Sequence, residues 1–152
     1  MAVPGLAHGQ EPTNPAAAVV KSKIMLTPEE MRWEDCSPAI PPGAKCAAIE
    51  GDRNAANVLF AYRLKMADGY KIPPHFHPAD ERLTVIKGTL NLGLGDKLDT
   101  NATKPMSAGS YVVVPKGTHH YAWSRGETIV QVNAIGPWGL TYVHPEDDPR
   151  KR

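Results

Sequence analysis

The chain of 152 residues has few of the features that mark membrane proteins or nucleic-acid-binding proteins. It contains no apolar run of the roughly 18 residues that a membrane-spanning helix needs. Its formal net charge is only +1, so the overall charge gives no attraction toward nucleic acid or an anionic membrane. We therefore expect neither a nucleic acid nor a membrane as a partner.

Cysteine is scarce, and its two copies, Cys36 and Cys46, lie ten positions apart. A disulfide between them is one alternative, but the sequence does not show the geometry that pairing requires. We expect two reduced thiols instead.

Residues 1–23 lack a hydrophobic period, and small or turn-forming residues dominate them. They also lack the basic start and the apolar centre of a signal peptide. We expect a flexible N-terminal arm here, followed by a single domain over residues 24–152. Two interpretations stay open: a cytoplasmic chain with a loose start, or a periplasmic or secreted chain whose signal peptide has been removed.

Long helical patterns are absent, whereas the 13 glycines and 15 prolines favour short elements joined by turns. Residues 27–30 (Thr-Pro-Glu-Glu) form the only helix-start signature, and they predict one short N-terminal helix of one or two turns. Alternating hydrophobicity elsewhere predicts about eight to ten short strands with frequent turns. The predicted fold class is therefore all-β, either a sandwich or a barrel.

Turn residues set the boundaries of the predicted strands. We expect one run to end at Gly88, a turn at residues 124–127 between two separate strands, and a polar loop at residues 96–105. The clearest predicted strands are residues 45–50, 58–66, 82–87, 109–114, 128–135 and 140–143.

The stretch that carries the most chemistry contains His75 and His77, with Glu81 four residues later. Side chains alternate along a strand, so both histidines point the same way, and Glu81 keeps their parity. Imidazoles and a carboxylate are ligands of divalent transition metals. The alternative is a pair of surface histidines without a ligand role.

Two further histidines, His119 and His120, are neighbours in the sequence and so point to opposite faces of a strand. Only one of them can join a common site. We expect His8, in the arm, and His144, near the tail, to be structural or solvent-exposed.

The spacing of these residues resembles the two motifs of the cupin superfamily. The first motif corresponds here to Gly69, His75, His77, Glu81 and Gly88, and the second to Gly109, Pro115, Gly117 and His120. The second motif usually ends in Asn four residues after its histidine, and this chain has Ser124 there. The chain is similar to small single-domain bacterial cupins of unassigned function.

The resemblance implies a double-stranded β-helix, or jelly roll, with a metal ion inside one mouth of the barrel. The family's ligands correspond to His75, His77, Glu81 and His120. One divalent transition metal ion is the expected cofactor, whether Fe, Mn, Ni, Co, Cu or Zn. Because cupins host oxygenases, isomerases, decarboxylases, lyases and binding proteins, the resemblance names no reaction.

Parity along the strands also indicates pocket residues. Tyr62 is expected to face inward, and Gln131 and Asn133 are candidates for polar contacts with a substrate. The three tryptophans, Trp33, Trp123 and Trp138, are candidates for the mouth of the pocket. No second carboxylate of matching parity follows the histidines, so no separate general base is evident.

These patterns favour a metal-dependent enzyme that acts on a small organic substrate, with dioxygenase-type chemistry first among the alternatives. The second alternative is a non-redox lyase, isomerase or hydrolase, and the third is a non-catalytic, sensor-like cupin that binds a metal or small molecule. We also expect a homodimer, because pairing protects the exposed edge strands of such sheets.

Overall fold

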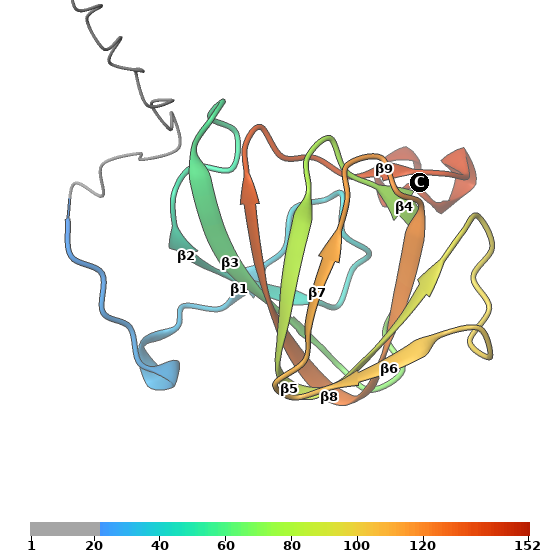
Figure 1. Cartoon of the computed structure of the whole chain (residues 1–152), viewed down its shortest axis with the longest axis horizontal. Coiled ribbons are helices and arrows are strands. Elements are labelled where there is room, and N and C mark those ends of the chain that lie inside the picture. Colours follow the sequence, from blue (N-terminus) through green and yellow to red (C-terminus); the bar gives the residue numbers. More distant parts are fainter. Residues whose placement is uncertain (1–21) are drawn as a thin grey trace, which may run out of the picture.

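The computed structural model describes residues 22–152, so most of the predicted arm lies outside the described residues. Nine antiparallel strands form one strongly curved sheet, which confirms the all-β prediction (Figure 1). The strands are β1 (Glu34–Asp35), β2 (Lys45–Glu50), β3 (Leu59–Met66), β4 (Lys71–Phe76), β5 (Glu81–Leu94), β6 (Lys104–Ser107), β7 (Tyr111–Val114), β8 (His120–Ile135) and β9 (Thr141–Tyr142).

The helices of residues 22–152 are three single 3-10 turns, η1 (Pro28–Glu30), η2 (Pro145–Asp147) and η3 (Pro149–Lys151). In η1 the Glu30 carboxylate accepts a hydrogen bond of 2.7 Å from the Thr27 amide, as the helix-start signature predicts. The segment nevertheless ends after three residues. It buries no side chain, and a short helix without packing is unstable in water. None of the helices in this part of the chain has the length and apolarity to span a membrane.

Strands β5 and β8 form the spine of the sheet, because they pair with each other along most of their length. The predicted break at Gly88 and the predicted turn at residues 124–127 are both wrong, since each strand continues through its glycine. Gly88 (φ 73°) lies at a bulge in β5, where a side chain would bring its Cβ within 2.4 Å of the Glu127 carbonyl oxygen. The glycines therefore bend two long strands instead of ending them.

Ser124 occupies the position where the resembled motif usually has Asn. Its side chain is fully buried, and its hydroxyl donates to the Ala67 carbonyl and accepts a 2.9 Å hydrogen bond from the Tyr70 amide. Ser124 thus fastens β8 to the turn between β3 and β4, immediately before the stretch with His75.

Strand β6 lies at an edge of the sheet, partly inside the region predicted as a polar loop. It pairs only with β5, with Pro105 opposite Asn91. Proline has no amide hydrogen to donate, so it is tolerated at an edge, where no further strand needs that donor. Because proline is unusual in strands, the sequence does not predict β6 as a strand.

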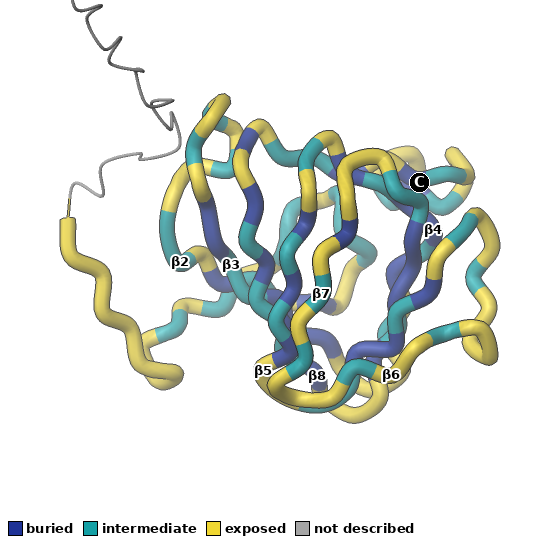
Figure 2. The backbone as a smooth tube through the Cα atoms, in the orientation of Figure 1, coloured by how far each residue is buried: buried dark blue, intermediate teal, exposed yellow. Residues whose placement is uncertain are grey.

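Buried residues are spread along the strands of the sheet (Figure 2), and the hydrophobic ones among them form one core cluster on its inner face. The alternation predicted for residues 58–66 is confirmed, with Leu64 and Met66 buried on the inner face. On β8, Val130 and Val132 share this inner face. Their neighbour Gln131 is paired with Arg63 on the other face of the sheet.

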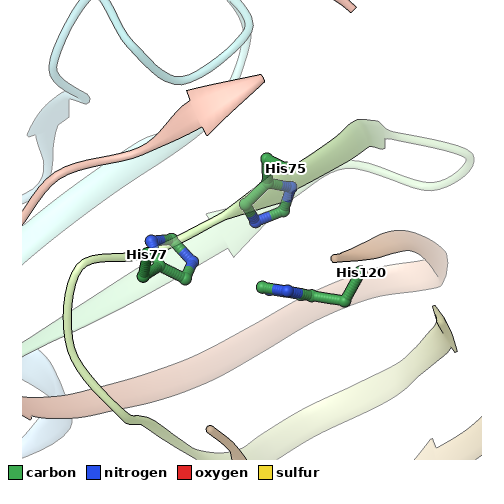
Figure 3. Close-up of side chains that lie close together, drawn as sticks. All are labelled: His75, His77 and His120. Carbon is green, nitrogen blue, oxygen red and sulfur yellow. The ribbon is translucent and has the colours of Figure 1, made fainter. Parts of the chain in front are cut away.

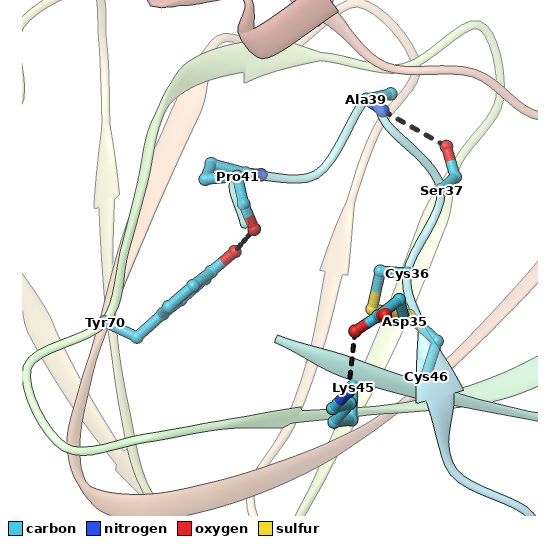
Figure 4. The surroundings of a disulfide bond; sticks show 8 residues. All are labelled: Asp35, Cys36, Ser37, Ala39, Pro41, Lys45, Cys46 and Tyr70. Carbon is cyan, nitrogen blue, oxygen red and sulfur yellow. Dashed lines mark hydrogen bonds and ion pairs between the residues drawn. A yellow bond between two sulfur atoms is a disulfide. The ribbon is translucent and has the colours of Figure 1, made fainter. Parts of the chain in front are cut away.

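A disulfide joins Cys36 to Cys46, so the expectation of two reduced thiols is wrong (Figure 4). The pairing of β1 with β2 places Asp35 opposite Lys45, and their side chains form an ion pair of 2.6 Å. This register brings the next residue, Cys36, to a Cα–Cα distance of 4.9 Å from Cys46. The decisive geometry is thus a strand pairing that the sequence does not reveal.

The segment between the two cysteines is fastened to the rest of the domain by tyrosines. Tyr70 donates its hydroxyl hydrogen to the Pro41 carbonyl, and Tyr142 donates to the Ala39 carbonyl over 2.7 Å (Figure 4 shows the first contact). Ile40, between these two anchors, lines the internal cavity described below.

Replacing both cysteines by serine is expected to lower the free energy of unfolding by about 2–3 kcal/mol, because the cross-link restricts the unfolded chain. Chemical denaturation of the wild type and of the double variant measures the change. Wild-type protein kept under a strong reductant is the control and is expected to lose the same amount. Equal stability of all three samples would contradict a structural disulfide.

Candidate metal centre

Three buried histidines meet, one from β4, one from the segment that follows it and one from β8 (Figure 3). His75 lies on β4, His77 follows the end of that strand, and His120 is the first residue of β8. The β4–β8 register pairs His75 directly with His120. Each residue is at most 5% exposed, so this is not a pair of surface histidines.

The imidazoles are close enough to share one ion. One ring nitrogen from each histidine lies within 4.8 Å of the corresponding atoms of the other two. The ring centroids of His75 and His120 are 4.2 Å apart, and those of His77 and His120 are 5.2 Å apart.

Backbone carbonyls determine which nitrogen of each ring is free. The Nδ1 atoms of His75, His77 and His120 lie 2.7, 2.7 and 2.9 Å from the carbonyl oxygens of Pro73, Gly139 and Thr118. A carbonyl only accepts hydrogen bonds, so each Nδ1 must carry the proton. In the neutral rings the Nε2 lone pairs are then available to a metal ion, which is the usual arrangement around ligating histidines.

Glu81, the first residue of β5, lies beside this cluster and is 6% exposed. Its Oε2 is 3.2 Å from His120 Nε2, and its Oε1 is 3.6 Å from His77 Nε2. Two buried atoms here, His77 Nε2 and Glu81 Oε2, have no hydrogen-bond partner among the described residues. A divalent cation would satisfy both, so the donor set fits a metal ion.

The protonation states of the cluster follow from burial and from Glu81. Burial, with the neighbouring imidazoles, holds the pKa of His75 well below its usual range, and burial also lowers the pKa of His77. Burial alone would lower the pKa of His120, but the contact with Glu81 outweighs it and raises that pKa. Burial likewise opposes ionisation of Glu81, yet His120 and His77 keep its pKa below the usual value.

A cavity of about 40 Å³ opens beside the cluster, and we call it the inner cavity. Apart from the three histidines and Glu81, its lining is almost entirely apolar, with Tyr62 as the one further polar side chain. The apolar lining includes Leu64, Met66, Leu83, Leu90, Ala122, Val130 and Val132. A bound ion would therefore face a water-poor space in which electrostatic interactions are strong.

Aromatic side chains border the cluster on the side of His77. Trp138 stacks on His77 at a centroid distance of 4.1 Å and also contacts Phe60 at 5.5 Å. Burial raises the pKa of Tyr62, and the negative charge of Glu81 raises it further. The hydroxyl of Tyr62 is therefore protonated at neutral pH and can act only as a hydrogen-bond donor or neutral acceptor.

The other residues singled out by sequence lie elsewhere. The parity argument places Gln131 and Asn133 at the pocket, but neither lines the cavity. Gln131 donates a 3.3 Å hydrogen bond to Asn133 on the opposite face of β8. The inner face of β8 belongs to Val130 and Val132 because the apolar side chains pack against the core.

Two of the tryptophans and two of the histidines also lie away from the cluster. Trp33 is covered by Lys65, and Trp123 donates to Thr103. Among the histidines, His119 points away from the cluster and pairs with Asp96 at 2.6 Å, and His144 contacts the Asp96 carbonyl. His8 lies outside the described residues.

The sequence analysis did not predict the loop residues that orient His77 and line the inner cavity. Gly139 supplies the carbonyl that orients His77, and Ile40 and Leu140 close the cavity. A backbone carbonyl leaves no signature in the sequence, and loop residues follow no period, so no signal was available for them.

Residues 62–136, just under half of the chain, match the model for the cupin domain. Over this segment the chain is similar to cupin-domain proteins. The matched segment contains all three clustered histidines and Glu81, so the family motif and the buried cluster coincide.

Curated relatives of the cupin domain include plant proteins. The chain is 39% identical to germin-like protein 5-1 of Oryza sativa subsp. japonica over 67 residues, which cover 43% of this chain and 30% of that protein. It is 34% identical to oxalate oxidase 1 of Hordeum vulgare over 89 residues, covering 53% of this chain and 44% of that protein. The chain thus matches less than half of the length of these relatives.

A solved structure extends the likeness of the fold. The polyketide cyclase RemF of Streptomyces resistomycificus superposes with a TM-score of 0.67 at 18% identity, over 86% of this chain and 92% of that one. At this identity the likeness shows a shared fold.

His77→Ala is expected to remove most of the bound metal from the purified protein, since it deletes a donor whose lone pair has no other partner. Elemental analysis after reconstitution measures the metal content. The matched control is His119→Ala, which alters a histidine outside the cluster and is expected to keep about one equivalent. Full retention of metal by His77→Ala would contradict the assignment.

The pKa shifts predict an unusual titration in the metal-free protein. By NMR, His75 is expected to stay neutral well below its ordinary pKa of 6.5, and His120 to hold its proton above 6.5. Because unfolded His75 binds a proton near pH 6.5 and the folded form does not, its contribution to stability falls as the pH drops through 6.5. The contribution of His120 has the opposite sign and is lost as the pH rises through its folded pKa. Ordinary titration of His75 near pH 6.5 would contradict the burial argument.

Proposed function

We propose that this protein is a metal-dependent enzyme that acts on a small chelating organic molecule and consumes dioxygen. The observation that carries the proposal is the buried cluster of His75, His77 and His120, with every Nδ1 bound to a carbonyl and the Nε2 atoms left free. Together with Glu81 these residues would hold one divalent ion. We infer that the sheet has the jelly-roll topology of the family, with the ion inside one mouth.

A divalent ion held by three imidazoles and one carboxylate would supply Lewis acidity and, if redox-active, the electrons that activate dioxygen. The remaining work belongs to the protein. The three carbonyls fix the ring orientations, and Glu81 supplies one negative charge. The apolar lining of the inner cavity limits the access of water to the reacting centre.

The size of the inner cavity limits what reaches the cluster. A volume of about 40 Å³ has room for about three water molecules, so only a small ligand or the end of a larger one fits beside the histidines. Tyr62 lies at this space with a protonated hydroxyl and can donate a hydrogen bond to a negatively charged oxygen of the substrate.

The names of two similar proteins support different chemistries. An oxalate oxidase is among the relatives, and this favours an oxygen-consuming reaction of the dioxygenase or oxidase type. The polyketide cyclase shares the fold and keeps the non-redox alternative in view, namely a lyase, isomerase or hydrolase. A binding protein without turnover is the remaining alternative. The homodimer stays a prediction.

Reconstitution with Fe(II), Mn(II) or Zn(II), followed by measurement of oxygen uptake, tests the proposal. The substrates are oxalate, acetylacetone and catechol, which chelate metals in different ways. We expect uptake with at least one substrate and one redox-active metal, and none with Zn(II). Glu81→Gln is expected to lower the rate at least about ten-fold, because it removes the one negative charge among the ligands.

Two outcomes would contradict an oxygen-consuming enzyme. Turnover with Zn(II) in the absence of oxygen would move the protein to the non-redox class. Thermal stabilisation by these ligands without any turnover would favour a binding protein.

A further inference from the structure

A second cavity, of about 170 Å³, adjoins the metal centre, and we call it the outer cavity. It shares four lining residues with the inner cavity, namely Ile40, Tyr62, His77 and Leu140. Trp138, which stacks on His77, lines it as well. A ligand in the outer cavity would therefore lie against His77 and Tyr62, which also line the inner cavity. The outer cavity has about four times the volume of the inner cavity.

The charge of the outer cavity comes from two arginines, and no carboxylate lines it. Arg150 is already paired, since its Nε and Nη2 atoms each lie 2.8 Å from an oxygen of Asp148 and Nη2 also donates to the Leu140 carbonyl. Arg53 has no ion pair and no side-chain hydrogen bond within residues 22–152. Arg53 is a half-buried residue, and its guanidinium donors are thus free among the described residues.

The backbone around Arg53 is held firmly against the loop that carries Trp138. The Arg53 carbonyl accepts a 2.7 Å hydrogen bond from the Trp138 amide. Two more bonds, of 3.0 and 2.8 Å, join Gly136 to Asn57 and Val58. Gly136 permits this approach, because a Cβ there would lie 2.3 Å from the Ala55 carbonyl oxygen. Arg53 and Trp138 are therefore fixed relative to each other.

Acidic residues are close to Arg53 on its other side. Glu34, Asp35 and Glu50 line a neighbouring cavity that Arg53 also borders. None of them forms an ion pair with Arg53, and Asp35 is paired with Lys45. Arg53 therefore borders one cavity that no carboxylate lines and a second cavity lined by three acidic residues, of which Asp35 is already paired with Lys45.

We propose that the outer cavity binds a carboxylate of the substrate through Arg53, and that the substrate is a small organic acid whose other end reaches the histidine cluster. This inference rests on the proposed function and names its substrate class. A guanidinium offers two parallel donors that match a carboxylate, and the interaction is strongest where water is partly excluded. The shared wall of Tyr62 and His77 connects the two ends of such a ligand.

Binding of pentanoate and of pentanamide to the full-length, metal-free protein tests the inference. The two compounds have nearly the same shape, and without metal the carboxylate has no ion to ligate. The readout is the NMR signal of the Trp138 indole N–H, followed as each compound is added. We expect pentanoate to shift this signal and to bind at least about ten-fold more tightly than pentanamide.

Two variants assign the effect to one side chain. Arg53→Gln is expected to weaken pentanoate binding at least about ten-fold. Arg53→Lys keeps the positive charge and is expected to retain part of the affinity for pentanoate. Arg32→Gln is the matched control, because it removes the same charge from an exposed residue, and it is expected to bind pentanoate as the wild type does. Equal binding of acid and amide, no binding of either, or full binding by Arg53→Gln would overturn the inference.

The same experiment separates this inference from the proposed function. If pentanoate binding depends on Arg53 but no metal or substrate yields oxygen uptake, the carboxylate site is supported and the proposed oxygen-consuming activity is contradicted. If oxygen uptake occurs and Arg53→Gln changes neither pentanoate binding nor the KM for an acidic substrate, the carboxylate site falls alone.

Discussion

Three imidazoles and one carboxylate are buried with their lone pairs directed toward a common space. His77 Nε2 and Glu81 Oε2 receive no hydrogen bond from the described chain, and a buried polar group without a partner costs about 1–3 kcal/mol. A divalent cation would offset this cost at both atoms together. The carbonyls of Pro73, Gly139 and Thr118 determine which ring nitrogen is left for the cation, because they hold the opposite nitrogen, Nδ1, in its protonated form. A bound metal ion would therefore offset the cost of the two unpartnered atoms.

The sheet supplies the framework that keeps this arrangement in place. His120 and Glu81 are the first residues of the two longest strands, β8 and β5, and these strands pair through two bends. The β4–β8 register sets His75 opposite His120. His75 lies next to the last residue of β4 and His77 follows that strand, whereas Glu81 and His120 begin their strands, so the donors gather at strand ends. The hydrophobic core fills the rest of the inner face of the sheet. Fastening of the turn before β4 by Ser124 adds to this framework.

The surroundings of the cluster divide into two regions of different character. The inner cavity is small and apolar, so it favours a dry reaction space and excludes large ligands. The outer cavity is larger and carries the free guanidinium of Arg53 without a lining carboxylate. Tyr62 and His77 belong to both. Such a division lets one part of a ligand provide affinity through its charge while another part meets the ion, which is how remote binding energy serves a reacting centre.

The local pattern of the chain was sufficient to predict the all-β class, the strand at residues 58–66 and the parity of His75 and His77. Alternation along a strand depends only on neighbouring residues, so it can be predicted without knowing the fold. The spacing that resembles the cupin motifs added His120 to the predicted set. Parity alone did not reveal which face of β8 turns inward, and Gln131 and Asn133 lie on the outer one.

Tertiary structure alone decided the features that join distant segments. The Cys36–Cys46 bridge depends on the β1–β2 register, and the glycines at 88 and 126 bend paired strands because each strand supports the other. The carbonyl of Gly139 and the guanidinium of Arg53 reach the site from loops that follow no period. The sequence by itself thus determined which donors share a face, since that is local geometry. Packing across the sheet decided what surrounds those donors, since such contacts exist only once separate strands and loops have met.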